Sequence, residues 1–265
     1  GFKLDVSIFE LYSAPKYENI IYVRNDYYPY PENQRWSSSK NYFKVMYAKT
    51  NYSLDIEEHK QILQNFMKDI SDTYTEFRPN QLKIIVECLN NRCALGILPV
   101  GSGKSLCYQL SSLLIPQLTV VVAPLQLLMD DQHDNIVTKL GMNNITVVRG
   151  GKTKNLQVFL DNQSLITLVS PERFFSEKFR MAFTEAKLSI GFIVIDEVHC
   201  LSEWGHDFRT SYLCLTHNLK LLLPEETYLM ALTGTASHRV YEDIKNEFRY
   251  FKEKDIPVIQ ADSMR

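Results

Sequence analysis

The chain has 265 residues, 45% of them hydrophobic, which is enough to bury the core of one large domain, or of one core domain with an appendage, without disulfides or metal ions. Its formal net charge of −2 excludes a surface that is basic throughout, so any binding of nucleic acid needs a local patch. The five cysteines form no C-x-x-C pair and no apolar run reaches the ~20 residues that cross a bilayer, so the composition argues against a zinc site and a membrane partner and favours a reducing, intracellular location.

Residues 1–54 differ in composition from the rest of the chain. They hold nine of the fifteen tyrosines, interspersed with Asn, Pro and Ser. Pro29 and Pro31 block helix formation and bias their predecessors toward extended structure, so we expect an irregular or short-stranded extension. Two hypotheses stay open for it: a surface appendage packed on the core, or an arm that binds a protein partner or stacks on nucleic-acid bases. Because residue 1 is Gly and no signal peptide is visible, we take the chain to be an excised piece of a longer protein.

From about residue 55 the sequence alternates between helical and strand patterns. Apolar residues between Ile56 and Ile70 recur mostly at a spacing of three to four, which predicts an amphipathic helix. Short apolar runs follow, most of them rich in β-branched residues and nearly without polar alternation, as is typical of strands buried on both faces. These runs are Ala94–Leu98, Thr119–Ala123, Ile145–Val148, Leu165–Val169, Phe192–Ile195 and Tyr228–Leu232. The sequence therefore predicts an α/β fold with a mainly parallel sheet flanked by helices on both faces, and ligands at the carboxyl ends of its strands.

A glycine-rich loop, Pro99-Val-Gly-Ser-Gly-Lys-Ser105, follows the first of these strands and precedes a helix that we expect from Leu106. Its glycines allow backbone N–H groups to face a phosphate chain, and the helix N-terminus adds partial positive charge. We expect Lys104 to hold the β and γ phosphates of ATP, and the Ser105 hydroxyl to bind Mg²⁺.

The strand at Phe192–Ile195 ends in two carboxylates, Asp196 and Glu197. A carboxylate at a strand end near a phosphate loop can hold Mg²⁺, directly or through water, and a neighbouring Glu can polarise the attacking water. We assign the first role to Asp196 and the second to Glu197. The alternative, a pair that merely caps the next element, is disfavoured by the phosphate loop upstream.

These motifs resemble those of RecQ-family DNA helicases, which belong to helicase superfamily two. Asp196-Glu-Val-His199 resembles the D-E-x-H box of that superfamily. The string Cys200-Leu-Ser-Glu-Trp-Gly-His-Asp-Phe-Arg209 closely resembles the aromatic-rich loop that is specific to RecQ helicases. The phosphate loop and its helix, Gly103-Lys-Ser-Leu-Cys-Tyr-Gln109, match as well, although Leu98 stands where the strict phosphate-loop pattern has Gly.

The resemblance covers roughly residues 55–265. It implies the first RecA-like, P-loop motor lobe of an ATP-dependent DNA helicase that moves 3′ to 5′. The implied cofactors are ATP and Mg²⁺, and the implied substrate is single-stranded DNA or a duplex junction. Roles in DNA repair and recombination, and a nuclear location if the organism is eukaryotic, are implied in the same way.

Further motifs carry implied roles. In Phe77-Arg-Pro-Asn-Gln81, the Gln side chain can donate to and accept from an adenine edge, and a nearby aromatic can stack on the ring. Trp204 and Phe208 would stack on or sense unpaired bases, with Arg209 on phosphate or a base face, unless these aromatics pack locally against the lobe. The implied residues are, for catalysis, Lys104, Asp196, Glu197 and His199; for the nucleotide, Tyr74, Arg78, Gln81, Val100, Gly101, Ser102, Gly103, Lys104 and Ser105; for Mg²⁺, Ser105 and Asp196; for nucleic acid, Pro124, Leu125, Ser170, Pro171, Glu172, Trp204, Phe208 and Arg209; and for coupling hydrolysis to movement, Thr233 and Thr235.

The chain departs from the family pattern at five positions. Glu203 replaces the usual Gln, and Asp130 stands where a basic residue is common, so both add negative charge near nucleic acid. Thr210 replaces Pro, Gly234 replaces Ala and Val100 replaces Thr, which alters backbone freedom or packing. None of these changes removes a residue that the ATP chemistry needs, and together they indicate a divergent member.

The resemblance also implies a second RecA-like lobe, whose arginines would stabilise the transition state, an effect worth ~10³ or more in rate. We therefore divide the chain into a Tyr-rich extension, 1–54, an ATP-binding domain, 55–262, and the start of a linker, 263–265. Alone, the chain should bind ATP·Mg²⁺ weakly and hydrolyse it poorly. Two other hypotheses stay open: an RNA helicase of the same superfamily, and a nucleotide-binding module that recruits a protein partner through residues 1–54.

Overall fold

The computed structural model describes most of the chain from residue 52 to residue 261. The described ranges are 21–24, 42–45, 52–71, 73–115, 117–124, 126–140, 145–148, 153–161, 164–185, 188, 190–202, 210–213, 215–234 and 236–261. The expected linker at 263–265 lies outside them.

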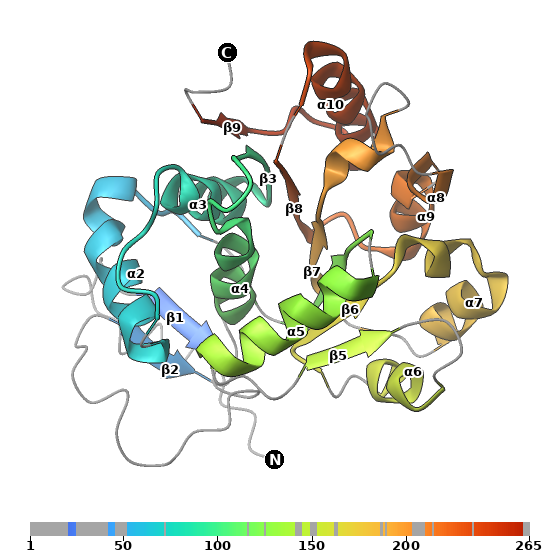
Figure 1. The fold of residues 1–265 in the computed structure, drawn as a ribbon, viewed down its shortest axis with the longest axis horizontal. Coiled ribbons are helices and arrows are strands. Elements are labelled where there is room, and N and C mark those ends of the chain that lie inside the picture. The colour runs from blue at the N-terminus through green and yellow to red at the C-terminus, as the bar shows by residue number, and fades with distance from the viewer. Residues whose placement is uncertain are drawn as a thin grey trace.

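A seven-stranded parallel sheet forms the centre of the molecule (Figure 1). Its order is β5-β6-β4-β7-β8-β3-β9, and each pair of neighbours is parallel. The strands are β3 (Cys93–Ile97), β4 (Leu118–Val122), β5 (Ile145–Val148), β6 (Ile166–Val169), β7 (Ile190–Ile195), β8 (Tyr228–Thr233) and β9 (Val258–Gln260). All residues of β3 to β8 are buried, which confirms the prediction of strands covered on both faces.

Helices cover both faces of the sheet, as predicted, because alternate strand residues point into two separate cores (Figure 1). Helices α2 to α5 contribute to one core together with Val194 and Met230, and the later helices contribute to the other together with Ile193 and Leu229. The helices are α2 (Ile56–Ile70), α3 (Gln81–Asn91), α4 (Lys104–Leu114), α5 (Gln126–Leu140), α6 (Thr153–Leu160), η2 (Pro171–Phe175), α7 (Glu177–Glu185), η3 (Val198–Leu201), α8 (Thr210–Leu213), α9 (Leu215–Leu222) and α10 (His238–Lys252). None of those in the described ranges is both long and apolar enough to cross a membrane.

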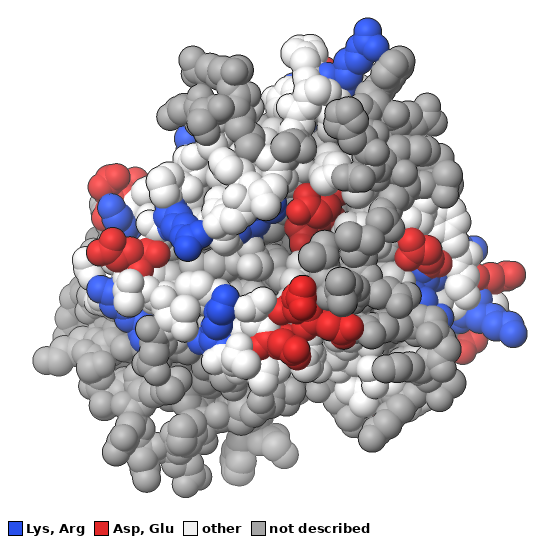
Figure 2. Space-filling model, in the orientation of Figure 1, with Lys and Arg blue, Asp and Glu red and all other residues white. Residues whose placement is uncertain are grey.

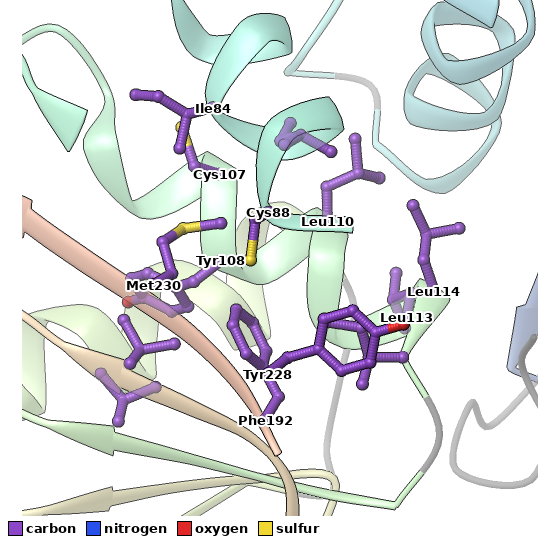
Figure 3. Packing of buried hydrophobic residues seen from close by; sticks show 14 of the residues in the cluster. Ile84, Cys88, Cys107, Tyr108, Leu110, Leu113, Leu114, Phe192, Tyr228 and Met230 are labelled. Carbon is purple, nitrogen blue, oxygen red and sulfur yellow. The ribbon is translucent and has the colours of Figure 1, made fainter. Parts of the chain in front are cut away.

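Helix α4, which begins at the phosphate loop, is buried on all sides. Every residue from Leu106 to Leu114 is buried, including the polar ones. Figure 3 shows its side chains among those of α3 and of the strands that carry Phe192 and Met230. Tight packing extends to β3, where a Cβ on Gly96 would lie 2.5 Å from the Ile84 side chain. The phosphate loop thus connects two elements that are packed tightly into the core.

The N-terminal extension contributes two short strands, β1 (Ile21–Arg24) and β2 (Tyr42–Val45), which pair in parallel. Strand β1 contacts α4. Just before α2, Leu54 and Asn90 exchange two hydrogen bonds of 2.7 Å, and the Tyr52 hydroxyl donates to the Leu114 carbonyl. These contacts support the packed-appendage hypothesis, while the boundary at residue 54 stays a prediction.

Candidate active site

Three adjacent strands, β7, β8 and β3, bring the predicted catalytic residues to one edge of the sheet. The phosphate loop follows β3, Asp196 follows β7, and Gly234 follows β8. Because the strands are parallel, their carboxyl ends all meet at this edge. The Leu98 N–H donates to the Thr233 carbonyl at 3.0 Å, so the loop begins directly beside the end of β8.

The phosphate loop has the backbone that its glycines predict. Gly101 and Gly103 both have a φ of +79°, a region that disfavours residues with a Cβ. Gly103 caps α4, which begins at Lys104, two residues earlier than we expected from its apolar pattern. Lys104 and Ser105 therefore belong to the first helical turn, where unpaired N–H groups and the helix dipole favour an anion. Val100 at the loop tip is 83% exposed.

Two residues of the predicted adenine motif brace this loop from outside. The Gln81 side-chain amide donates to the Ser102 and Gly103 carbonyls at 3.0 and 2.9 Å, and its oxygen accepts from the Arg78 N–H at 2.8 Å. The Arg78 guanidinium donates to the Gly101 carbonyl. Gln81 is 1% exposed, so its polar atoms are engaged by the loop rather than by water. Tyr74 lies partly buried against the neighbouring core.

A chain of polar contacts runs from the loop lysine to β8. Lys104 Nζ lies 3.6 Å from Glu197 Oε1, and His199 Nδ1 lies 3.3 Å from Glu197 Oε2. The same His199 nitrogen is 2.8 Å from the Thr233 hydroxyl. Contacts with the Cys200 sulfur and with Glu197 raise the pKa of His199 to about 10, so the imidazole is cationic at neutral pH. Glu197 has a φ of +49°, a costly conformation for this residue type that clusters at functional sites.

The two adjacent carboxylates lie in different environments. Burial, and then the negative charge of Glu197, raise the pKa of Asp196 to about 6. Burial acts on Glu197 as well, but the hydrogen bond from His199 and the charge of Lys104 outweigh it and lower the pKa of Glu197. The Asp196 oxygens accept hydrogen bonds from the Glu197 N–H at 3.0 Å and from the Gln132 amide at 2.6 Å.

The residues predicted to contact nucleic acid divide into two groups. Pro124 follows β4, which is a neighbour of β7, and Ser170, Pro171 and Glu172 follow β6, one strand further from β7 at the same edge. The structure thus places these four residues beside the candidate active site. Of the two residues predicted for coupling, Thr233 ends β8 and contacts His199. The remaining residues predicted for nucleic acid or coupling lie outside the described residues: Leu125, Trp204, Phe208, Arg209 and Thr235.

Three contacts at this site could not be anticipated from motifs. Gln132 bonds to Asp196, and the Tyr212 hydroxyl donates to the Asp196 carbonyl at 3.0 Å. Gly234 and Val100, which both differ from the family pattern, also lie close together here. A Cβ on Gly234 would lie 3.1 Å from Val100 Cγ2 and 3.2 Å from Lys104 Nζ. Gln132 carries a weak sequence signal, since it is a polar residue on the apolar face of a helix.

Comparison with known proteins identifies the class. A family model described as DEAD/DEAH box helicase matches residues 78–244, more than half of the chain, and the chain belongs to this family. At the level of the fold, the UvsW helicase of bacteriophage T4 aligns with a TM-score of 0.53 and 14% identity over 83% of this chain and 72% of that one. The Hef helicase domain of Pyrococcus furiosus aligns with a TM-score of 0.53 and 15% identity over 70% of this chain and 38% of that one.

The curated relatives include RecQ-family DNA helicases, in agreement with the resemblance seen in the motifs. The ATP-dependent DNA helicase RecQ of Haemophilus influenzae is 36% identical over 200 residues, which cover 71% of this chain and 31% of that protein. The ATP-dependent DNA helicase Q1 of Mus musculus is 35% identical over 196 residues, covering 70% of this chain and 29% of that protein. The chain thus spans less than a third of the length of these relatives.

Proposed function

We propose that the chain is the ATP-binding lobe of a RecQ-like, ATP-dependent DNA helicase that unwinds DNA in the 3′-to-5′ direction. The observation that carries this proposal is the contact of Lys104 with Glu197 at 3.6 Å, beside Asp196 and at the mouth of the phosphate loop. A structural ion pair would not need the glycine-rich loop, the helix N-terminus and the second carboxylate at the same place. The family assignment implies ATP binding, and we assign that binding to these residues.

The residues of the site divide the work of ATP hydrolysis. Lys104 would bind the terminal phosphates, and its contact with Glu197 would weaken as it does so. Glu197, whose pKa is lowered, is ionised at neutral pH and would orient the attacking water and accept its proton. His199 would fix the Glu197 carboxylate and connect it to Thr233 on β8, so that a change at the phosphates reaches this strand.

Ser105 and Asp196 fit a magnesium ion. Hydroxyl and carboxylate oxygens are the donors that Mg²⁺ prefers, and the described side chains form no closed cluster of three or more His, Cys, Asp or Glu that would compete for another metal. Such a sparse set suits an ion that keeps water and phosphate ligands. When bound, Mg²⁺ would neutralise charge on the phosphates.

Gln81 and Arg78 would link adenine recognition to the phosphate loop. For Gln81 to bind an adenine edge, its amide must exchange at least one of its bonds to the Ser102 and Gly103 carbonyls. Base binding would thereby loosen the loop brace as the phosphates enter. Tyr74 would stack on the base, because it lies near this motif with part of its ring exposed.

The complete motor would need a second lobe and a DNA strand. Pro124, Ser170, Pro171 and Glu172, at the ends of β4 and β6, would contact the strand, with the Trp204–Arg209 segment stacking on unpaired bases. The second lobe would supply the arginines that stabilise the transition state. We place the protein inside the cell, and in the nucleus if the organism is eukaryotic. The four described cysteines form no disulfide, which is typical of proteins in a reducing compartment.

The test is ATP turnover by the full-length protein without nucleic acid, with single-stranded DNA and with single-stranded RNA. We expect strong stimulation by DNA, and loss of turnover by about a hundredfold or more in Lys104→Ala, because the phosphates lose their cation. Lys83→Ala, on the exposed side of α3, is the matched control. Stimulation by RNA alone would assign an RNA helicase instead. No stimulation by either would favour a nucleotide-binding interaction module.

A further inference from the structure

One side chain connects α5 to the strand end that carries Asp196. The Gln132 side-chain amide donates to Asp196 Oδ2 at 2.6 Å, across 64 positions of sequence. The other carboxylate oxygen, Oδ1, accepts from the backbone N–H of Glu197 and is therefore fixed by the local chain. The position of Oδ2 thus depends on a residue from another element, α5.

Gln132 occupies a position where helix periodicity favours an apolar residue. Met129, Ile136 and Leu140 are buried and define the sheet-facing side of α5. Gln132 lies on the same side, three residues after Met129 and four before Ile136.

The fold gains little from an amide at this position. The Gln132 oxygen, Oε1, is buried and has no hydrogen-bond partner in the part of the chain that the structure describes. A buried polar atom without a partner costs stability, so an apolar side chain of the same length would pack there at least as well. What the amide adds is its bond to Asp196.

We propose that Gln132 is a positioning residue that orients the Asp196 carboxylate and makes this orientation depend on the position of α5. This inference rests on the proposed ATPase function. Helix α5 begins two residues after Pro124, at the strand end proposed to contact DNA, and Gln132 lies in its second turn. A shift of the first turns of α5 upon DNA binding would therefore be transmitted to Asp196 through one side chain.

The first test measures how nucleotide binding to this chain depends on Mg²⁺. A fluorescent ADP analogue is titrated at a series of Mg²⁺ concentrations with wild type and Gln132→Met, which retains length but cannot donate. We expect the half-saturating Mg²⁺ concentration to rise by about tenfold, as for other residues that orient a metal ligand, with binding in EDTA unchanged. Thermal unfolding of both proteins checks that the variant folds; loss of the bond to Asp196 and removal of the unpaired oxygen have opposite effects on stability, so we expect only a small change in the midpoint temperature.

Gln157→Met is the matched control, because the exposed Gln157 of α6 donates a hydrogen bond of 2.7 Å to the carboxylate of Asp161, the residue after this helix. It should leave Mg²⁺ dependence unchanged. Gln132→Asn keeps an amide but is one methylene shorter, and should act like Gln132→Met even if that variant folds poorly. A half-saturating concentration within twofold of wild type in both Gln132 variants would overturn the proposal.

The second test separates positioning from DNA contact in the full-length protein. In Gln132→Met, the factor by which single-stranded DNA stimulates ATP turnover should fall several-fold, while DNA affinity measured by fluorescence anisotropy stays unchanged. An unchanged factor would refute the coupling, and weakened DNA binding would make Gln132 a contact residue instead. If wild type itself is not stimulated, it is the proposed helicase function that fails, and the Mg²⁺ titration still decides the positioning role.

Discussion

At the scale of single residues, the site is built at some cost to stability. Asp196 is 7% exposed, and burial raises its pKa to about 6 from an ordinary value of 3.8. The unfolded chain therefore holds the ionised carboxylate more favourably than the folded one. Glu197, the next residue, has the opposite shift, because His199 and Lys104 stabilise its charge.

We predict that Asp196→Asn stabilises the chain while it abolishes ATP turnover. At pH 7 the gain is up to about 3 kcal/mol, the free energy that corresponds to the raised pKa. The free-energy cost of burying the ionised Asp196 is fully present above pH 6 and disappears as the pH falls toward 4. The stability gained by Asp196→Asn should therefore shrink over this pH range. The asparagine side chain that replaces the carboxylate can still accept a hydrogen bond from the Glu197 N–H. If the Gln132 amide group rotates by half a turn, its oxygen, which has no partner now among the described residues, can accept a hydrogen bond from the new asparagine amide.

Urea unfolding of both proteins at pH 7 and pH 4.5 measures this difference. Glu197→Gln is the control, because loss of a carboxylate with a lowered pKa should not stabilise the fold at pH 7. An Asp196→Asn variant that is less stable than wild type at pH 7 would contradict the prediction.

The sequence predicts the parts of the site that form within one short segment. Lys104 and Ser105 follow from the glycine pattern, and Asp196 and Glu197 follow from their place after a buried strand. The contacts that Gln132 and Tyr212 make with Asp196 were missed because they depend on which helix crosses which strand end, and short-range patterns carry no such information. Gln81 was singled out for adenine, but its bonds to the loop carbonyls needed the relative position of α3 and the loop.

At the scale of elements, strand positions were predicted closely because burial on both faces leaves a strong pattern. Ile145–Val148 has the predicted bounds, whereas the predicted run Ala94–Leu98 is shifted by one residue, to Cys93–Ile97. Hydrogen bonding, not apolarity, ends a strand, and Leu98 is as apolar as its neighbours. The start of α4 was predicted two residues too late because the apolar pattern begins at Leu106, whereas the helix already includes the polar residues Lys104 and Ser105.

Helix α10 ends in a buried lysine that ties it to the turn before β8. Lys252 is 5% exposed, and its ammonium donates to the Glu225 carbonyl at 3.0 Å and to the Thr227 carbonyl. Burial lowers the pKa of Lys252 to about 8. The folded chain therefore releases this proton at a lower pH than the unfolded chain does.

This shift predicts how the stability contribution of Lys252 changes with pH. Between pH 8 and 10.5 the unfolded chain binds the proton more tightly, so the stability of wild type relative to Lys252→Met should rise with pH, by up to about 3 kcal/mol. Chemical unfolding of both proteins at pH 7.5 and pH 10 measures it. Lys254→Met removes an exposed lysine and should show no comparable change; a flat difference for Lys252→Met as well would refute the prediction.

At the scale of the whole molecule, charge is spread unevenly over the face shown in Figure 2, where acidic side chains gather over α5. That helix carries Asp130, Asp131 and Asp134, against one base in its last turn, Lys139. Because α5 follows the proposed DNA-contact residue Pro124, a phosphate backbone there would meet repulsion. The proposed DNA binding would then rely on other residues, including those proposed after β6.

We predict that Asp130→Lys tightens the binding of single-stranded DNA by about tenfold at low salt, and less at high salt, because the added charge acts through phosphate. Fluorescence anisotropy at two salt concentrations measures both effects. Glu185→Lys makes the same change of charge on α7, which packs on the opposite face of the sheet, and should have little effect. Equal gains from the two variants would show that overall charge, not the position of α5, sets the affinity.

The position of β3 in the sheet has a consequence for biosynthesis. Its two neighbours are β8 and β9, whose residues, 228–233 and 258–260, are translated long after 93–97. While the ribosome makes the intervening segments, this strand has neither lateral partner, and the loop that follows it has no fixed platform. The candidate nucleotide site should therefore be among the last parts of the fold to assemble. A nascent chain that is halted before residue 228 would contain the complete phosphate-loop sequence but not the structure that we expect to bind ATP.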